Sequence, residues 1–149
     1  MKPFETQPHP PTRCTVDIEV RYAETDQMGI VHHANYIIWF ELARTELCRL
    51  GGSAYADIEK LGYWLIVTRV EVRYGRSALY GQTVQVDCWL EKHTSRGLYF
   101  GYEVRHGDEK LVTGFTEHLW VDAKTGRPCR APEPLREQFA RLAAAEEDG

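Results

Sequence analysis

The alternation of hydrophobic and polar positions predicts a β-strand where the folded region begins. From residue 14 to residue 22 every second side chain is hydrophobic, which is the period of a strand with one buried face. The residues expected on that face are Cys14, Val16, Ile18, Val20 and Tyr22. Residues 1–13 are rich in proline and polar groups, so we expect a flexible tail there. Residues 14–149 are long enough to form a single domain with its own core.

Helical spacing replaces this alternation after a short polar connection. One side of the segment 35–50 carries the apolar stripe Tyr36, Phe40, Ala43, Leu47 and Leu50. Asn35 is the expected N-cap, and the glycines at positions 51 and 52 supply the stop. The first turn, YIIWF, is apolar on every side. We therefore expect a sheet to surround this helix.

The remaining segments predict mainly strands. The stretch WLIVTRVEVRY sets Val70, Val72 and Tyr74 against Arg69, Glu71 and Arg73, and TVQVDCWLEK sets Val84, Val86, Cys88 and Leu90 against polar neighbours. Residues 98–122 predict a hairpin that turns at Gly107-Asp108. Short helices are expected within SAYADIEKL and, at the C-terminus, within PEPLREQFARLAAA. A strand, a helix and then consecutive strands predict an α+β fold with a mainly antiparallel sheet.

Composition and charge narrow the classes of protein. The formal net charge of -4 argues against a nucleic-acid partner held by general electrostatic attraction. The four cysteines form no CxxC pair of the kind found in zinc and redox sites. No stretch has the roughly 18 uninterrupted apolar residues of a membrane-spanning helix, and the N-terminus lacks an apolar signal region. We therefore expect a cytoplasmic protein without a transmembrane segment.

One polar stretch, ETDQMGIVHHANY (24–36), connects the first strand to the helix. Asp26 follows the strand and His33 immediately precedes the helix, so a carboxylate and a helix N-terminus are expected to meet. Hydrolysis of a thioester needs a nucleophile or general base and donors for the developing oxyanion. The leaving thiol, with a pKa of about 8.5, departs with little protonation. A carboxylate and free helix amides therefore suit this reaction without a full triad.

The same stretch carries a family resemblance. YAETDQMGIVHHANYIIWFELAR resembles the signature of the 4-hydroxybenzoyl-CoA thioesterase family of hotdog-fold acyl-CoA thioesterases. Downstream, VTRVEVRYGRSALYGQTVQV, SRGLYFGYEV and TGFTEHLWVDAKTGRP look like later strands of that family, so the resemblance covers about residues 14 to 132. It implies a hotdog fold, an antiparallel sheet wrapped around one long central helix. It also implies acyl-CoA hydrolysis without a metal or cofactor, in homodimers or homotetramers whose sites lie between subunits.

The resemblance assigns roles to four residues of the stretch. Asp26 matches the catalytic aspartate, which acts as nucleophile or general base. His33 matches the position whose backbone amide polarises the thioester carbonyl at the helix start, and its side chain is a candidate to assist. Tyr22 matches an active-site tyrosine of some members, and Gly29 matches the loop glycine.

Three arginines are candidates for binding the phosphates of CoA. Arg69, Arg73 and Arg76 lie on or just beyond one predicted strand, and arginine forks match phosphate oxygens. An ordinary solvated face that alternates with Glu71 is the other interpretation, and the pattern does not decide between them. Glu24 shares the polar stretch with Asp26 but is assigned a structural role, because acidic residues are mostly solvated.

Two other functions remain open at this point. Hotdog dehydratases act on acyl thioesters through a histidine and a carboxylate, and His32 or His33 with Glu41 could imitate that pair. The second is a non-catalytic module that binds acyl-CoA or an acyl carrier protein. Product analysis separates them, because only hydrolysis releases a free thiol. The adjacent histidines do not predict a metal site, since neighbouring side chains diverge and no third ligand has supporting spacing.

Overall fold

Five strands form one antiparallel sheet in the computed structural model, which describes residues 12–52 and 55–144. The strands are β1 (Arg13–Glu19), β2 (Tyr63–Tyr74), β3 (Thr83–His93), β4 (Gly97–His106) and β5 (Glu109–Asp122). Their order across the sheet is β1-β3-β4-β5-β2, and every neighbouring pair is antiparallel. The helices are α1 (Asn35–Leu50), α2 (Tyr55–Lys60) and α3 (Glu133–Ala144), with a 3-10 turn, η1 (Tyr22–Glu24), after β1. The predicted α+β class is confirmed.

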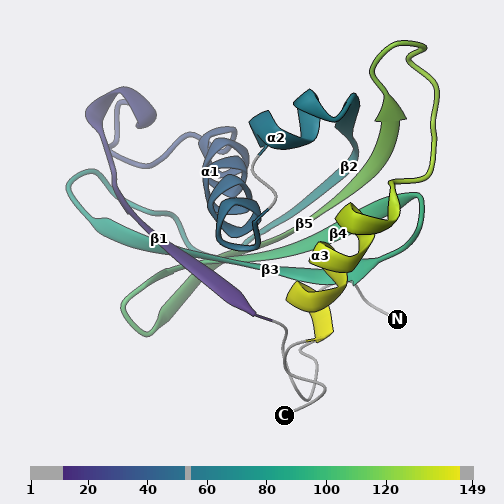
Figure 1. Ribbon diagram of the computed structural model, residues 1–149. Helices are drawn as coiled ribbons and strands as arrows, with labels where there is room; N and C mark the ends of the chain where they lie inside the picture. Colours follow the sequence, from purple (N-terminus) through teal and green to yellow (C-terminus); the bar gives the residue numbers. More distant parts are fainter. Residues whose placement is uncertain (1–11, 53–54, 145–149) are drawn as a thin grey trace.

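The long helix α1 lies across the concave face of the curved sheet (Figure 1). The inward side chains of β3 and β4 are almost completely buried, namely Val84, Val86, Cys88, Leu90, Leu98, Phe100, Tyr102 and Val104. Phe40 of α1 stacks on Tyr102, with ring centroids 4.4 Å apart. Glycine is required at position 114 of β5, because a Cβ atom there would clash with the Phe40 ring. The predicted arrangement, a sheet wrapped around one long helix, is therefore confirmed.

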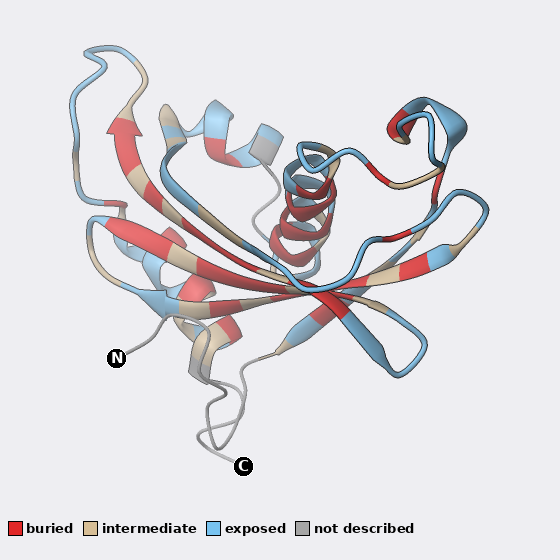
Figure 2. Cartoon of the chain, turned by 180° about the vertical axis from the view of Figure 1, so that it is seen from behind, coloured by how far each residue is buried: buried red, intermediate tan, exposed pale blue. Residues whose placement is uncertain are grey.

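The sheet wraps α1 as predicted, but the expectation that the helix is largely surrounded at its apolar first turn does not hold within a single chain. Ile37, Ile38 and Leu42 are exposed to 41, 53 and 51 %, respectively. Leu50 was expected in the buried stripe but is 59 % exposed, whereas Cys48 is fully buried. Figure 2 shows buried and exposed residues on different sides of α1. One sheet can cover only part of the circumference of a helix, so an apolar stripe of α1 faces outward.

Strand β2 forms an edge of the sheet, and its predicted buried face is half open. Val70 and Tyr74 lie on the α1 side, but they are 38 and 48 % exposed. The prediction that both are buried is wrong, because among the described strands β2 has a neighbour, β5, on one side only. A bulge at Thr68 shifts the pairing register, so Val67 and Val70 face the same side although they are three residues apart.

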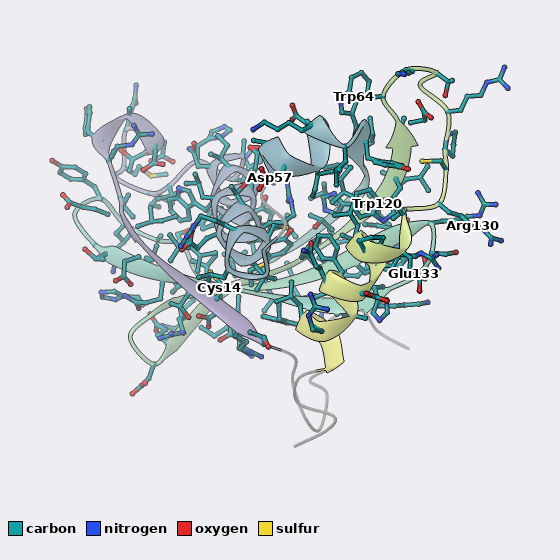
Figure 3. The ribbon with its side chains drawn as sticks, in the orientation of Figure 1. Cys14, Asp57, Trp64, Trp120, Arg130 and Glu133 are labelled. Carbon is teal, nitrogen blue, oxygen red and sulfur yellow. The ribbon has the colours of Figure 1, made fainter. Side chains whose placement is uncertain are left out.

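Helix α3 covers one end of the core. Its Phe139 contacts Trp120 of β5, with ring centroids 5.8 Å apart. Figure 3 labels Trp120 beside α3. Leu142 packs against Gly51 so closely that a Cβ atom at position 51 would lie 2.7 Å from it. The predicted short helix, C-terminal helix and hairpin are all confirmed, and Gly107 has the positive φ, 62°, that the hairpin turn requires.

The predicted tail, residues 1–13, lies almost entirely outside the described residues. Strand β1 begins at Arg13. Among residues 12–52 and 55–144, no helix combines the length and the apolar content needed to cross a membrane.

Candidate active site

The polar stretch between η1 and α1 folds as a short ribbon. Thr25 bridges Val31 across it, and the Asp26 amide donates a hydrogen bond to the Ile30 carbonyl at 2.8 Å. Ile30 in turn bridges Leu79, which belongs to the connection between β2 and β3. Backbone pairing on both sides therefore gives this stretch a defined shape, although it looks like an ordinary loop in the sequence.

The Asp26 carboxylate is oriented by the backbone of its own turn. Its Oδ1 atom accepts hydrogen bonds from the amides of Met28 at 2.8 Å and Ile30 at 3.2 Å. Gly29 completes the turn with a φ of 77°, a conformation that side chains other than glycine rarely adopt. Asp26 is exposed, and its Oδ2 atom makes no hydrogen bond within the described part of the chain. One oxygen is thus held by the turn, while the other is available to a substrate or water.

The N-terminus of α1 lies directly after this ribbon. The prediction that Asn35 caps α1 is wrong, because the helix begins at Asn35 and Ala34 before it provides no side-chain cap. The Asn35 Nδ2 atom instead donates to the Glu24 carbonyl at 2.9 Å. The His32 amide donates to the same carbonyl at 2.8 Å, whereas the His33 amide has no acceptor among residues 12–52 and 55–144. A free backbone donor therefore exists where the sequence predicted one.

His33 is held from the other side by the end of β2. Its carbonyl oxygen accepts a hydrogen bond from the Tyr74 hydroxyl at 3.0 Å. The two rings pack edge to face, with centroids 6.3 Å apart, and burial raises the pKa of Tyr74. The His33 ring also stacks on His32 at 4.3 Å, and both imidazoles are exposed. The His33 side chain is therefore accessible beside the free amide.

The predicted position of Tyr22 is wrong. It does not end the first strand on the inward face but opens η1, and its side chain is 73 % exposed. Its ring packs edge to face against Tyr80, with centroids 5.7 Å apart. The chain leaves β1 after Glu19, so the alternation that placed Tyr22 inward no longer applies.

Glu24 is the buried carboxylate of the site, a feature that the sequence did not reveal. Only 6 % of the residue is exposed, so its expected solvation is wrong. Burial alone would raise its pKa, but hydrogen bonds from the Arg21 amide and the Trp39 indole, with the Arg21 charge, outweigh it and lower the pKa. Trp39 is 15 residues away in the sequence, so no local signal identifies this contact.

The three arginines do not gather around Asp26 within one chain. Arg69 and Arg73 alternate with the residues of β2 that face α1 and therefore lie on the opposite face of the sheet. Arg69 pairs with Glu71. Arg76 pairs with Glu109 at 2.8 Å and lies in the connection between β2 and β3, three residues before Leu79, which bridges the Asp26 ribbon.

Glu41 is separated from the histidines and belongs to a different cleft. It lies two turns into α1, 3.9 Å from Arg44, and both line a cleft of about 340 Å³ between α1, α2 and β2. Arg44 is buried and donates to the Tyr102 hydroxyl at 3.0 Å. A chain of hydrogen bonds continues from Tyr102 through Thr116 to buried His118. The structure therefore does not pair Glu41 with His32 or His33.

Comparison with known proteins places the chain in a family. The model of the thioesterase-like superfamily matches residues 20–139. The Bacillus subtilis protein named "Putative acyl-CoA thioesterase YneP" is 39 % identical over 113 residues, which are 75 % of this chain and 82 % of that protein.

Solved structures show the same relationship. DHNA-CoA thioesterase from Staphylococcus aureus is 35 % identical with a TM-score of 0.85, covering 92 % of this chain and 95 % of that chain. The hypothetical protein TT1821 from Thermus thermophilus is also 35 % identical, with a TM-score of 0.83 over 87 % of this chain and 98 % of its own. The chain therefore belongs to the thioesterase-like superfamily, whose hotdog fold it shares.

Proposed function

We propose that this protein hydrolyses acyl-CoA thioesters to a free carboxylic acid and CoA. The observation that carries the proposal is the combination of an oriented Asp26 carboxylate and an unpaired His33 amide at the two ends of one short ribbon. These two groups meet the needs of thioester hydrolysis, a base or nucleophile and an oxyanion donor. Membership of the superfamily and the names of its relatives support the same activity.

In the proposed reaction, Asp26 either attacks the thioester carbonyl carbon or removes a proton from a water molecule that attacks it. The carbonyl oxygen gains negative charge, which the His33 amide stabilises. The C–S bond then breaks, and CoA leaves as a thiolate that takes up a proton. If Asp26 itself attacks, the resulting mixed anhydride is hydrolysed by water, which restores the carboxylate and yields the acid. Tyr22 and the His33 side chain, both exposed here, are proposed to contact the substrate.

The substrate is proposed to be an aromatic or aliphatic acyl-CoA, with an acyl carrier protein as the alternative thioester donor. Resemblance to the 4-hydroxybenzoyl-CoA thioesterase family and likeness to a DHNA-CoA thioesterase support testing aromatic acyl groups first. Arg69, Arg73 and Arg76 are proposed to bind CoA phosphates, and Gly29 to allow the substrate to approach the turn. Of the three arginines, Arg76 lies within the connection between β2 and β3, which borders the Asp26 ribbon.

We also propose that the active unit is a homodimer, or a homotetramer built from such dimers. Two features support a second copy along β2. The strand lies at an edge of the sheet, and the exposed apolar stripe of α1 lies beside it. Ile37 and Ile38 of α1 and Val67 and Val70 of β2 all line one small pocket between these elements. A second copy would bury this surface close to the start of α1.

The proposed function is tested by supplying aromatic and aliphatic acyl-CoAs to the purified protein and measuring release of free thiol. Asp26→Asn is the informative variant, because its amide oxygen can still accept the Met28 and Ile30 hydrogen bonds. We expect it to lose at least about 100-fold in kcat, since the carboxylate is removed while the turn is kept. Altered acyl chains with an intact thioester would instead indicate a dehydratase, and tight binding without turnover would indicate a binding module.

A further inference from the structure

A carboxylate that reacts with a substrate must be held in a fixed position relative to the oxyanion donor. Misplacement by about 1 Å can cost a factor of about 100 in rate. Asp26 lies in an exposed ribbon, whereas α1 is anchored in the core. The Oδ1 bonds of Asp26 are made within its own turn and do not connect that turn to α1. Another residue must therefore link the ribbon to the helix.

The side chain of Glu24 makes such a link. Its Oε2 atom accepts a hydrogen bond from the indole nitrogen of Trp39 at 2.9 Å, and Trp39 is completely buried in α1. Its Oε1 atom accepts one from the Arg21 amide, also at 2.9 Å, where the chain leaves β1. The two oxygens of one carboxylate thus join the start of the polar stretch to the second turn of α1.

The backbone of Glu24 makes a second link. Its carbonyl accepts the His32 amide at 2.8 Å and the Asn35 side chain at 2.9 Å. The same residue therefore contacts the chain before the ribbon, after the ribbon and inside the helix. His32 is one position before the free amide, and Asp26 is two positions after Glu24.

The neighbouring aromatic residue extends the connection to the other side of the ribbon. Trp39 packs against Tyr36, with ring centroids 5.0 Å apart, and the Tyr36 hydroxyl accepts a hydrogen bond from the Ala78 amide at 2.9 Å. Ala78 in turn accepts one from the Val31 amide at 3.0 Å, at the end of the ribbon. Both sides of the ribbon are thus tied to the first two turns of α1.

We propose that Glu24 is a positioning residue of this site: its buried carboxylate fixes Asp26 relative to the N-terminus of α1 through Trp39 and Arg21. This inference rests on the proposed function, because it assigns Glu24 a role in the hydrolysis that Asp26 carries out. Glu24 itself does not touch the substrate. A charged group that is this well buried is costly unless its hydrogen bonds are all made, so replacing one oxygen by an NH2 group disturbs the whole link.

The experiment compares kcat and KM of Glu24→Gln, Trp39→Phe and the double variant on the best acyl-CoA of the wild-type panel. Glu24→Gln places an NH2 group opposite an N–H donor, and Trp39→Phe removes the indole N–H but keeps most of the ring. We expect Glu24→Gln to lower kcat about 10- to 100-fold with KM within about twofold of the wild-type value. The double variant should lose no more than Glu24→Gln alone, because both changes break the same link.

Two control variants separate positioning from general stability. Glu46→Gln changes another carboxylate of α1, one that pairs with Arg49 away from the ribbon, and should leave kcat unchanged. Leu142→Ala loosens α3 against Gly51 and should lower Tm without lowering kcat at temperatures where the protein is folded.

The results that would overturn the proposal are distinct from those that would overturn the function. If Glu24→Gln is folded and keeps kcat within twofold while Asp26→Asn is inactive, Glu24 positions nothing and the hydrolase assignment stands. If Leu142→Ala loses as much kcat as Glu24→Gln at equal Tm, the role of Glu24 is stability alone. A wild-type protein that releases no thiol from any acyl-CoA overturns both proposals.

Discussion

The Tyr74 hydroxyl donates a hydrogen bond to the His33 carbonyl at 3.0 Å, which ties the last residue of β2 to the start of α1. These two residues are 41 positions apart in the sequence. The bond orients the backbone whose amide is the proposed oxyanion donor.

Replacing Tyr74 by phenylalanine is expected to lower kcat about five- to tenfold. The change removes one hydrogen bond, worth about 1 kcal/mol, while keeping the ring that packs against His33. Steady-state hydrolysis of an acyl-CoA measures the effect. Tyr99→Phe is the matched control, because Tyr99 stacks on Phe115 across the sheet from α1. Equal kcat for Tyr74→Phe and the wild type would show that this bond does not matter for the reaction.

The free energy of unfolding is expected to fall as the pH is lowered, partly because of buried His118. Burial first and the Arg44 charge second lower the pKa of His118 from 6.5 to about 3, and its Nδ1 atom has no hydrogen-bond partner among the described residues. Between these pH values the unfolded chain binds a proton at this residue and the folded chain does not. The contribution of neutral His118 to the free energy of unfolding is therefore fully present above pH 6.5. It falls by about 1.4 kcal/mol per pH unit as the pH is lowered towards 3.

Urea unfolding at several pH values measures this slope for the wild type and His118→Gln. The variant should be less stable near neutral pH. Between pH 6 and pH 4 its free energy of unfolding should fall less steeply, because about one proton fewer is taken up on unfolding. His93→Gln changes an exposed histidine and is the matched substitution control. Parallel slopes for His118→Gln and the wild type would mean that His118 does not resist protonation in the folded state.

Arg76→Ala is expected to raise KM for acyl-CoA about tenfold with little change in kcat, because a charge-assisted hydrogen bond to a phosphate contributes about 1.5–3 kcal/mol. The N-acetylcysteamine thioester of the same acyl group lacks these phosphates, so its KM should be unaffected. Arg49→Ala removes an arginine at the far end of α1 and serves as the control. An equal rise in KM for both thioesters would place Arg76 at the acyl group or the fold rather than at CoA.

Ile66→Lys is expected to convert the proposed dimer into monomers with much lower activity. Ile66 is 43 % exposed on the edge strand β2, and lysine on an edge strand disfavours pairing with another strand. Sedimentation velocity of the wild type and variant, together with thiol release, measures both effects. Leu50→Lys alters an equally apolar residue, 59 % exposed at the far end of α1, and should remain a dimer. A fully active wild-type monomer would contradict the proposed assembly.

Local patterns in the sequence predicted the elements of the fold and the position of the candidate chemistry. The alternation at Val84, Val86, Cys88 and Leu90 predicted a strand whose inward residues are all buried. The stripe through Tyr36, Phe40 and Ala43 predicted α1. Both succeed because contact with a core repeats at the fixed period of each element. Asp26 and His33 became candidates because they lie next to element boundaries, which local patterns mark, and because the stretch resembles a thioesterase signature.

The three-dimensional packing determines which of these residues are covered and which groups hold them. Tyr22 is exposed and Glu24 is buried, the reverse of what their local sequence predicted, because the chain turns into η1 after β1. Asn35 binds the Glu24 carbonyl instead of capping its helix. Trp39 and Tyr74 reach the site from positions distant in the sequence. Such contacts depend on how the sheet curves around α1, and no periodic pattern along a single chain records that curvature.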